Sequence, residues 1–247
     1  MGSLFDGIGG FPLAASRYGI KPVWASEIEA FPIEVTKLHF PGMIHVGDIT
    51  KLNGADLPPV DIITGGSPCQ DLSVAGARAG LAGDRSGLFM EQIRVIKEMR
   101  AADIQRGRPT EYIRPRFGVW ENVPGAFSSG TPKGEDFRIV LEEFLRINFD
   151  PIYVPRPYTG RWEPSGRILL GTSFSLAWRV FDTQYWPGTP QRRRRIYLVV
   201  DFGGTTAPQI LFDQESMCRD YSALIRTRET IAPSVAESIG TAGWNPT

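Results

Sequence analysis

The segment Val60-Asp61-Ile62-Ile63-Thr64-Gly65-Gly66-Ser67-Pro68-Cys69-Gln70 places a cysteine shortly after a run of apolar residues. The run from Val60 to Thr64 is typical of a buried strand, and the Gly-Gly-Ser-Pro that follows it is typical of a tight loop. In an open α/β sheet, the loops at the carboxyl ends of the strands hold the ligand and the reactive groups. The segment therefore predicts that Cys69 lies at the functional edge of such a sheet.

Short apolar runs alternate with helical patterns along most of the chain. This alternation is typical of a mostly parallel sheet with helices on both faces, which is a doubly wound α/β fold. The predicted strands are residues 3–5, 22–25, 44–46, 60–64, 117–120, 176–181 and 196–200. The predicted helices are residues 11–18, 33–39, 88–100 and 136–147, with Asp136 as the N-cap of the last, and residues 233–240 as one more short helix.

The composition limits the kinds of chemistry available. A chain of 247 residues that is 42% hydrophobic can bury the core of one large domain, and 27 basic against 27 acidic residues produce no general basic field. Two distant cysteines indicate a reducing compartment, which we expect to be the cytoplasm. Two histidines and no Cys-x-x-Cys predict no metal site, and no apolar run approaches the ~20 residues that span a membrane. Cysteine, carboxylate and arginine remain as the candidate reactive groups.

The stretch Phe5-Asp6-Gly7-Ile8-Gly9-Gly10 has the pattern of a strand-to-helix loop that lets the backbone approach a ligand. A simple tight turn is the alternative, and for a lone glycine pattern it is the more frequent one. Glu27 follows the next predicted strand about 20 residues later, where a carboxylate can hold ribose hydroxyls. Asp48 follows the third, where it can accept from an adenine amino group. The Gly-x-Gly-x-x-Gly of phosphate-bearing dinucleotide sites is missing, so the pattern favours an adenosyl ligand without phosphates.

Three further groups have both a structural and a functional interpretation. Cys69 is either an inert buried thiol or a nucleophile, and a nucleophilic thiolate needs a cation nearby. Glu121, in Glu121-Asn122-Val123, is either a structural ion-pair partner or a catalytic carboxylate. The run from Gln191 to Arg195 leads directly into a predicted strand, so Arg193 and Arg195 should face one side while Arg192 and Arg194 face the other. Arg193 and Arg195 are the candidate cations for Cys69.

Taken together and in this order, these motifs resemble the DNA (cytosine-5) methyltransferase family. The resemblance implies a Rossmann-like class I methyltransferase domain over residues 1–202, with S-adenosylmethionine as cofactor and double-stranded DNA as partner. It also implies methyl transfer to C5 of a flipped cytosine, through a covalent bond between Cys69 and C6. The catalytic residues that it implies are Cys69, Glu121, Arg193 and Arg195. The implied cofactor contacts are Phe5, Asp6, Gly7, Gly9, Gly10, Glu27, Ile28, Asp48, Ile49, Pro68 and Leu88, and the implied substrate contacts are Gln70, Ser73, Asn122, Val123 and Gln191.

The sequence departs from the family pattern in its last part. The family has a target-recognition region after the arginine motif and then an Asn-Ser-Val segment, but only 45 residues follow Phe202 here, and Pro233 precedes Ser234-Val235. We therefore expect a small recognition domain that is reduced or missing, with residues 203–247 as a short C-terminal segment, and a monomer that binds DNA weakly. Residues 151–174 read as an inserted loop or hairpin whose arginines and aromatics either contact DNA or are simply solvated. Methylation of tRNA cytosine, and a catalytically weak DNA- or cofactor-binding role, are the alternative functions.

Overall fold

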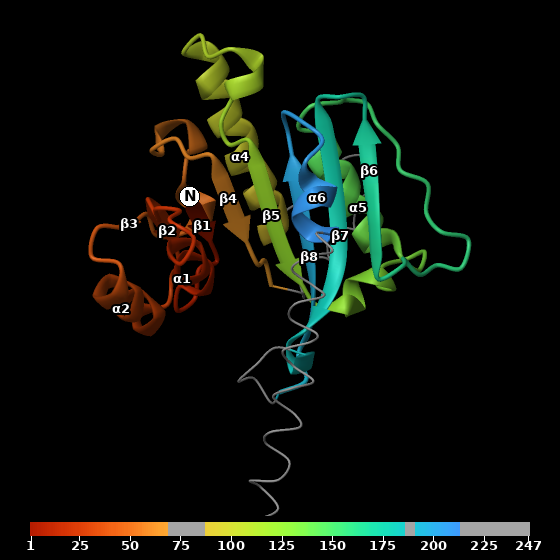
Figure 1. The fold of residues 1–247 in the computed structure, drawn as a ribbon, viewed down its shortest axis with the longest axis horizontal. Coiled ribbons are helices and arrows are strands. Elements are labelled where there is room, and N and C mark those ends of the chain that lie inside the picture. Colours follow the sequence, from red (N-terminus) through yellow and green to blue (C-terminus); the bar gives the residue numbers. More distant parts are fainter. Residues whose placement is uncertain (69–86, 186–190, 213–247) are drawn as a thin grey trace, which may run out of the picture.

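The computed structural model describes residues 1–68, 87–185 and 191–212. Within these ranges, eight strands form one sheet in the order β3-β2-β1-β4-β5-β8-β7-β6 (Figure 1). The strands are β1 (Gly2–Leu4), β2 (Trp24–Ser26), β3 (Ile44–His45), β4 (Ile62–Gly65), β5 (Phe117–Asn122), β6 (Ser165–Leu170), β7 (Phe174–Asp182) and β8 (Arg194–Asp201). The α-helices are α1 (Gly10–Ser16), α2 (Ala30–His39), α4 (Leu88–Gln105), α5 (Glu135–Leu145) and α6 (Ala207–Phe212). The 3-10 helices are η1 (Ile49–Lys51), η2 (Gly54–Asp56), η3 (Thr110–Tyr112), η4 (Pro124–Phe127) and η5 (Thr183–Tyr185).

The sheet is parallel from β3 through β5 and antiparallel beyond it. β1 pairs in parallel with both β2 and β4, whereas β8 is antiparallel to both β5 and β7. The predicted α/β class with a mostly parallel sheet is confirmed. The strand order reverses between β1 and β4, and ligands of open α/β sheets bind at such a switch point, outside the carboxyl ends of the strands. The glycine loop follows β1 and the segment leading to Cys69 follows β4, so both motifs begin at this point.

Helices cover both faces of the sheet. In Figure 1, α4 and α5 lie behind the sheet and α6 lies in front of β7 and β8. The largest fully buried side chains are aromatic, and several of them meet edge to face, as Phe89 does with Trp120 and with Phe144. Such pairs stabilise a core beyond the burial of their area. Among the helices in the described parts of the chain, none has the length and apolar character that a membrane crossing requires.

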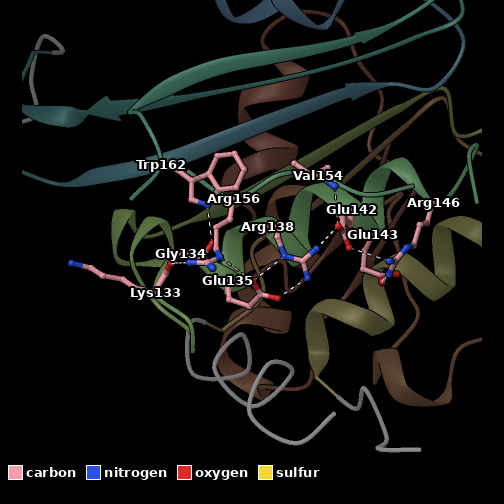
Figure 2. A network of polar contacts seen from close by, with 10 residues as sticks. All are labelled: Lys133, Gly134, Glu135, Arg138, Glu142, Glu143, Arg146, Val154, Arg156 and Trp162. Atoms are coloured by element: carbon pink, nitrogen blue, oxygen red, sulfur yellow. Dashed lines mark hydrogen bonds and ion pairs between the residues drawn. The ribbon is translucent and has the colours of Figure 1, made fainter. Parts of the chain in front are cut away.

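A network of charged residues fixes the segment after α5 onto that helix (Figure 2). The carboxylate of Glu142, which is 2% exposed, accepts hydrogen bonds from the Val154 N–H at 3.0 Å, from Arg146 at 3.0 Å and from Arg138. Because each of its oxygens has a cationic or N–H partner, the buried charge of Glu142 is compensated. The segment that includes Val154 is therefore fastened to α5 by a side chain of the helix itself.

Residues 151–174 contain β6, which forms an antiparallel hairpin with β7. Two of the side chains considered for DNA contact form hydrogen bonds with other parts of the chain. Trp162 is 8% exposed and donates from Nε1 to the Gly134 carbonyl at 2.8 Å, and Arg156 donates to the Lys133 carbonyl at 2.9 Å. Trp162 is thus a core residue, whereas Tyr158 is fully exposed.

Some predicted boundaries were wrong. Gly134, not Asp136, is the N-cap of α5, because Gly134 adopts a φ of 84° that L residues rarely reach, while Asp136 lies in the first turn and is 1% exposed. β5 extends to Asn122 because its last residues pair with Ile196 and Tyr197 of β8. α6 was not predicted at all. The helix expected at residues 233–240 lies outside the described residues.

Candidate active site

The loop after β1 is a backbone turn that needs its glycines. Phe5, Gly7 and Gly9 all have positive φ, at 54°, 55° and 84°. A Cβ on Gly9 would lie 2.9 Å from the Thr36 Cγ2 of α2, so this position also lacks the room for a side chain. Among the described residues, a Cβ on Gly7 would meet nothing within 4 Å, and neither would one on Gly10. The loop is therefore packed against α2 at Gly9 and is not covered at Gly7 by the described part of the chain.

Glu27 is fixed beside this loop by backbone donors. One carboxylate oxygen accepts from the Gly7 N–H at 2.8 Å, and the other accepts from the N–H groups of Ile28 at 2.8 Å and Glu29 at 3.0 Å. A carboxylate has about four lone-pair sites, so it retains acceptor capacity for a ligand. The arrangement links the ends of β1 and β2 and presents an oriented acceptor that suits the hydroxyls of a ribose.

The other predicted cofactor contacts differ in their surroundings. Asp48 is the N-cap of η1, and its Oδ1 accepts from both the N–H and the hydroxyl of Thr50, at 3.0 and 2.8 Å. These hydrogen bonds lower the pKa of Asp48 below its ordinary value, so it is a carboxylate at neutral pH. Ile28 is 69% exposed, whereas Ile49 is 4% exposed and belongs to the core. Pro68 is exposed, and Leu88 is half-buried at the start of α4.

Two buried side chains of β5 hold the segment that leads to Cys69. Trp120 Nε1 donates to Ser67 Oγ at 3.2 Å, and Asn122 Nδ2 donates to the Ser67 carbonyl at 3.1 Å. The Asn122 side chain also accepts from the Val123 N–H at 2.8 Å, so both ends of its amide are used. Ser67 is consequently fixed against β5 just before Pro68. Cys69 itself, with Gln70 and Ser73, lies outside the described residues.

Glu121 and Arg195 form an ion pair across β5 and β8. Arg195 Nε lies 2.9 Å from Glu121 Oε1, and the two side chains are 21% and 22% exposed. The other oxygen, Oε2, lies 3.2 Å from where a Cβ on Gly66 would be, so the carboxylate rests against the backbone that leads to Ser67. The structure thus brings Glu121, Arg195 and Gly66 together at the carboxyl edge.

The arginine motif divides between the two sides of β8. Arg193 and Arg195 both act on Tyr197, on one side of β8. Burial and the charge of Glu121 raise the pKa of Tyr197, while the charges of the two arginines lower it. Arg192 instead lies 3.7 Å from Asp182, with 72% of its side chain exposed. These contacts agree with the predicted alternation. The position of Tyr197, between the rings of Phe11 and Phe181, was missed because an aromatic residue in an apolar strand gives no functional signal.

The site as a whole has two parts. The acceptors suited to an adenosyl ligand lie along the carboxyl ends of β1, β2 and β3, and the Glu121–Arg195 pair lies at β5 and β8. Gln191 is exposed at the start of the second part. No group of histidine, cysteine and acidic residues within the described ranges has the arrangement of a metal site.

Comparison with known proteins gives this arrangement a family. The family model of the C-5 cytosine-specific DNA methylases matches residues 1–201. A DNA N-6-adenine-methyltransferase of Escherichia phage P1 is 29% identical over 98% of this chain and 34% of its own length. The type II methyltransferase M1.ScrFI of Lactococcus lactis subsp. cremoris is 35% identical over 60% of this chain and 34% of its own length.

A solved structure shares the fold. It is described as a DNA modification methyltransferase encoded within an E. coli prophage, and it aligns with a TM-score of 0.50 at 23% identity, covering 81% of this chain and 46% of the other. This chain spans about a third of the length of the curated relatives it matches. The family model covers most of this chain. The chain therefore belongs to the C-5 cytosine-specific DNA methylase family.

Proposed function

We propose that this chain transfers a methyl group from S-adenosylmethionine to C5 of cytosine in double-stranded DNA. S-adenosylmethionine is the cofactor that membership of the family implies. The observation that carries the proposal is the anchoring of Ser67 by Trp120 and Asn122. This anchoring fixes the residues just before Cys69 beside the Glu121–Arg195 pair, which is the combination that the chemistry of cytosine requires.

The residues of the first part of the site fit the cofactor. Glu27 offers an oriented carboxylate for the ribose hydroxyls, and Asp48 is positioned by η1 as an acceptor for the adenine amino group. The open side of the loop at Gly7 leaves room for a ligand to approach the backbone. When bound, S-adenosylmethionine would supply the methyl group as an electrophile, and the protein has to make C5 of the cytosine ring nucleophilic.

Cytosine C5 becomes nucleophilic when a thiolate adds to C6 of the ring. In our proposal the Cys69 sulfur forms a bond to C6, while Glu121 holds N3 and the amino group and assists protonation of the ring. C5 then takes the methyl group, a base removes the C5 proton, and the C6–S bond breaks to release the thiolate and restore the double bond. Arg195, held by Glu121, and Arg193 provide the positive charge that favours the thiolate.

The target base of a duplex has to leave the base stack to reach such residues. Enzymes that modify a base extrude it into a pocket, at a cost of a few kcal/mol. The residues proposed to receive the base are Gln70, Ser73, Asn122, Val123 and Gln191. Because the Asn122 amide already binds Ser67 and Val123, its role in this set is to position the loop.

Methylation of adenine N6 is the second candidate, because the relative from phage P1 carries that name. This chain corresponds to only 34% of that relative, so the named activity describes a much longer protein. The family model, which covers most of this chain, favours cytosine.

Two measurements on the full chain test the proposal. Duplex DNA incubated with the protein and labelled cofactor should yield 5-methylcytosine and no N6-methyladenine on nucleoside analysis. tRNA incubated in the same way should remain unlabelled. A duplex that carries 5-fluorocytosine should trap a covalent adduct, because fluorine cannot leave C5 as a proton does. Cys69→Ala should abolish the adduct, and Cys218→Ala is the matched control that should retain it. N6-methyladenine as the main product, or an adduct formed by Cys69→Ala, would contradict the proposal.

A further inference from the structure

The Asp6 carboxyl is buried where the central strands of the sheet end. The residue is 7% exposed, and its Oδ1 accepts from Ser3 Oγ at 2.5 Å, while the Ser3 oxygen lies 3.3 Å from Thr64 Oγ1. Its backbone N–H donates to the Ser26 carbonyl at 3.2 Å. Oδ2 is buried and has no hydrogen-bond partner among the residues that the structure describes. Buried polar atoms in native proteins are nearly always paired, so an unpaired carboxyl oxygen beside a ligand loop calls for a function.

The charge state of this carboxyl is sensitive to its surroundings. Burial raises the pKa of Asp6 to about 6, the hydrogen bond from Ser3 opposes this rise, and the negative charge of Glu27 adds to it. Among the described residues, the charge that acts on Asp6 is that of Glu27, which directly follows β2, whereas Ser3, Ser26 and Thr64 are neutral. A further charge near the loop would therefore change how much of Asp6 is ionised.

We propose that Asp6 is a specificity-determining residue of the cofactor site, which favours the positively charged sulfonium of S-adenosylmethionine over the neutral thioether left after methyl transfer. This inference rests on the proposed function. Asp6 directly precedes Gly7, where a Cβ would meet none of the described residues within 4 Å. A cation bound there acts on a carboxyl that is shielded from water, where electrostatic attraction is stronger than in bulk solvent. The thioether, S-adenosylhomocysteine, differs from the donor by the methyl group and this one charge.

The interaction between the sulfonium charge and the Asp6 carboxyl predicts how the affinity for S-adenosylmethionine changes with pH. Below pH 6 the carboxyl of the free protein is protonated, so binding of the cation expels a proton to the buffer and becomes weaker as the pH falls. Above pH 6 the carboxyl is ionised before binding, and the attraction is fully present. If the cation lowers the pKa of Asp6 by one unit, the donor should bind about fivefold more weakly at pH 5 than at pH 7. The neutral thioether should change by less than about twofold, because it has no sulfonium charge to couple with the proton.

Calorimetry on the full chain tests this coupling without a measurement of turnover. Binding is recorded in two buffers of different ionisation enthalpy, so that the difference in heat gives the number of protons released. We expect the donor to release about half a proton between pH 5 and 6 and almost none at pH 7, and the thioether to release almost none throughout. Asp6→Asn keeps the size of the side chain and should abolish the release and narrow the preference for the donor.

Ser3→Ala separates this role from a structural one. It removes the hydrogen bond that stabilises the Asp6 carboxylate, so the proton release should move to higher pH while the protein remains folded. Donor binding without proton release by the natural chain, or release that persists in Asp6→Asn, would overturn the inference and leave the proposed function intact. If the natural chain does not bind S-adenosylmethionine, both this inference and the proposed function are contradicted.

Discussion

At the scale of single residues, Glu27 and Glu121 are carboxylates with different partners and therefore different expected roles. Glu27 is fixed by backbone N–H groups at the end of β2, and Glu121 is paired with Arg195 beside Gly66. Glu27→Ala should weaken S-adenosylmethionine by about 2 kcal/mol, or roughly thirtyfold, because charge-assisted hydrogen bonds are lost. Glu121→Gln should lower turnover by about a hundredfold or more and leave cofactor affinity within about twofold.

Calorimetry for the cofactor and initial rates on duplex DNA measure the two effects separately. Glu34→Gln is the matched control, because Glu34 is an exposed carboxylate paired with Lys37 on α2. It should change neither quantity. If Glu121→Gln weakens the cofactor while Glu27→Ala spares it, the roles of the two carboxylates have been exchanged.

At the scale of elements, the end of β5 determines where the segment after β4 can lie. Asn122→Asp retains the oxygen that accepts from Val123 but loses the donor to the Ser67 carbonyl. We expect a loss of about 1–3 kcal/mol in the free energy of unfolding and a lower kcat, because the residues before Cys69 are no longer fixed. Cofactor affinity should be unchanged.

Asn148→Asp distinguishes positioning from stability alone. Asn148 donates from Nδ2 to the Phe202 carbonyl at 2.9 Å, as Asn122 does to Ser67, but it lies beyond the other end of the sheet. Denaturant unfolding should show a smaller loss of stability for Asn148→Asp, because its new carboxylate faces Arg100, which donates to Asn148 Oδ1 at 3.2 Å. The kcat of the folded protein should fall only for Asn122→Asp. Equal kcat values would mean that the β5 contacts with Ser67 serve stability only.

Local sequence patterns predicted some of the helices and strands but not others. The strands of the parallel part were predictable, because their apolar runs are short and bounded by turn residues, as in Val60 to Thr64. α6 was not predictable from its six residues, since it is stabilised by packing of Ala207 and Leu211 on Ala177 and Val199 of the sheet. Asp136 resembled an N-cap in sequence, but the tertiary contact of Gly134 with Trp162 fixes the start of α5 two residues earlier.

The candidate site was predictable in its residue types but not in its contacts. Glu27, Asp48 and Glu121 were identified because each follows or ends a strand, and the topology of the sheet brings such positions to one edge. The burial of Asp6 was not predictable, because it depends on Ser3 and Thr64 from two different strands. The anchoring of Ser67 was likewise invisible, since Trp120 and Asn122 are distant from it in sequence.

At the scale of the whole molecule, the chain is formally neutral, so attraction to DNA has to come from where its charges lie. β8 begins at the carboxyl edge of the sheet with Arg194, which is exposed. Arg192, just before the strand, has 72% of its side chain exposed and forms an ion pair with Asp182 at 3.7 Å. A surface pair of this kind contributes about 0–1 kcal/mol, so it leaves Arg192 available to a phosphate. These two arginines are therefore well placed to contact the backbone of a duplex whose base enters the site.

Replacing both residues, as Arg192→Gln with Arg194→Gln, should weaken DNA binding at low salt and flatten its dependence on salt. Each phosphate contact that is lost reduces the slope of log K against log salt by about 0.9, so the double variant should lose about 2. Arg106→Gln is the matched control, because Arg106 follows the end of α4 at the amino edge of the sheet and should leave the slope unchanged. Binding isotherms at several salt concentrations, with duplexes of different sequence, measure the slopes. An unchanged slope in the double variant, or an equal loss in Arg106→Gln, would show that DNA lies along a different surface.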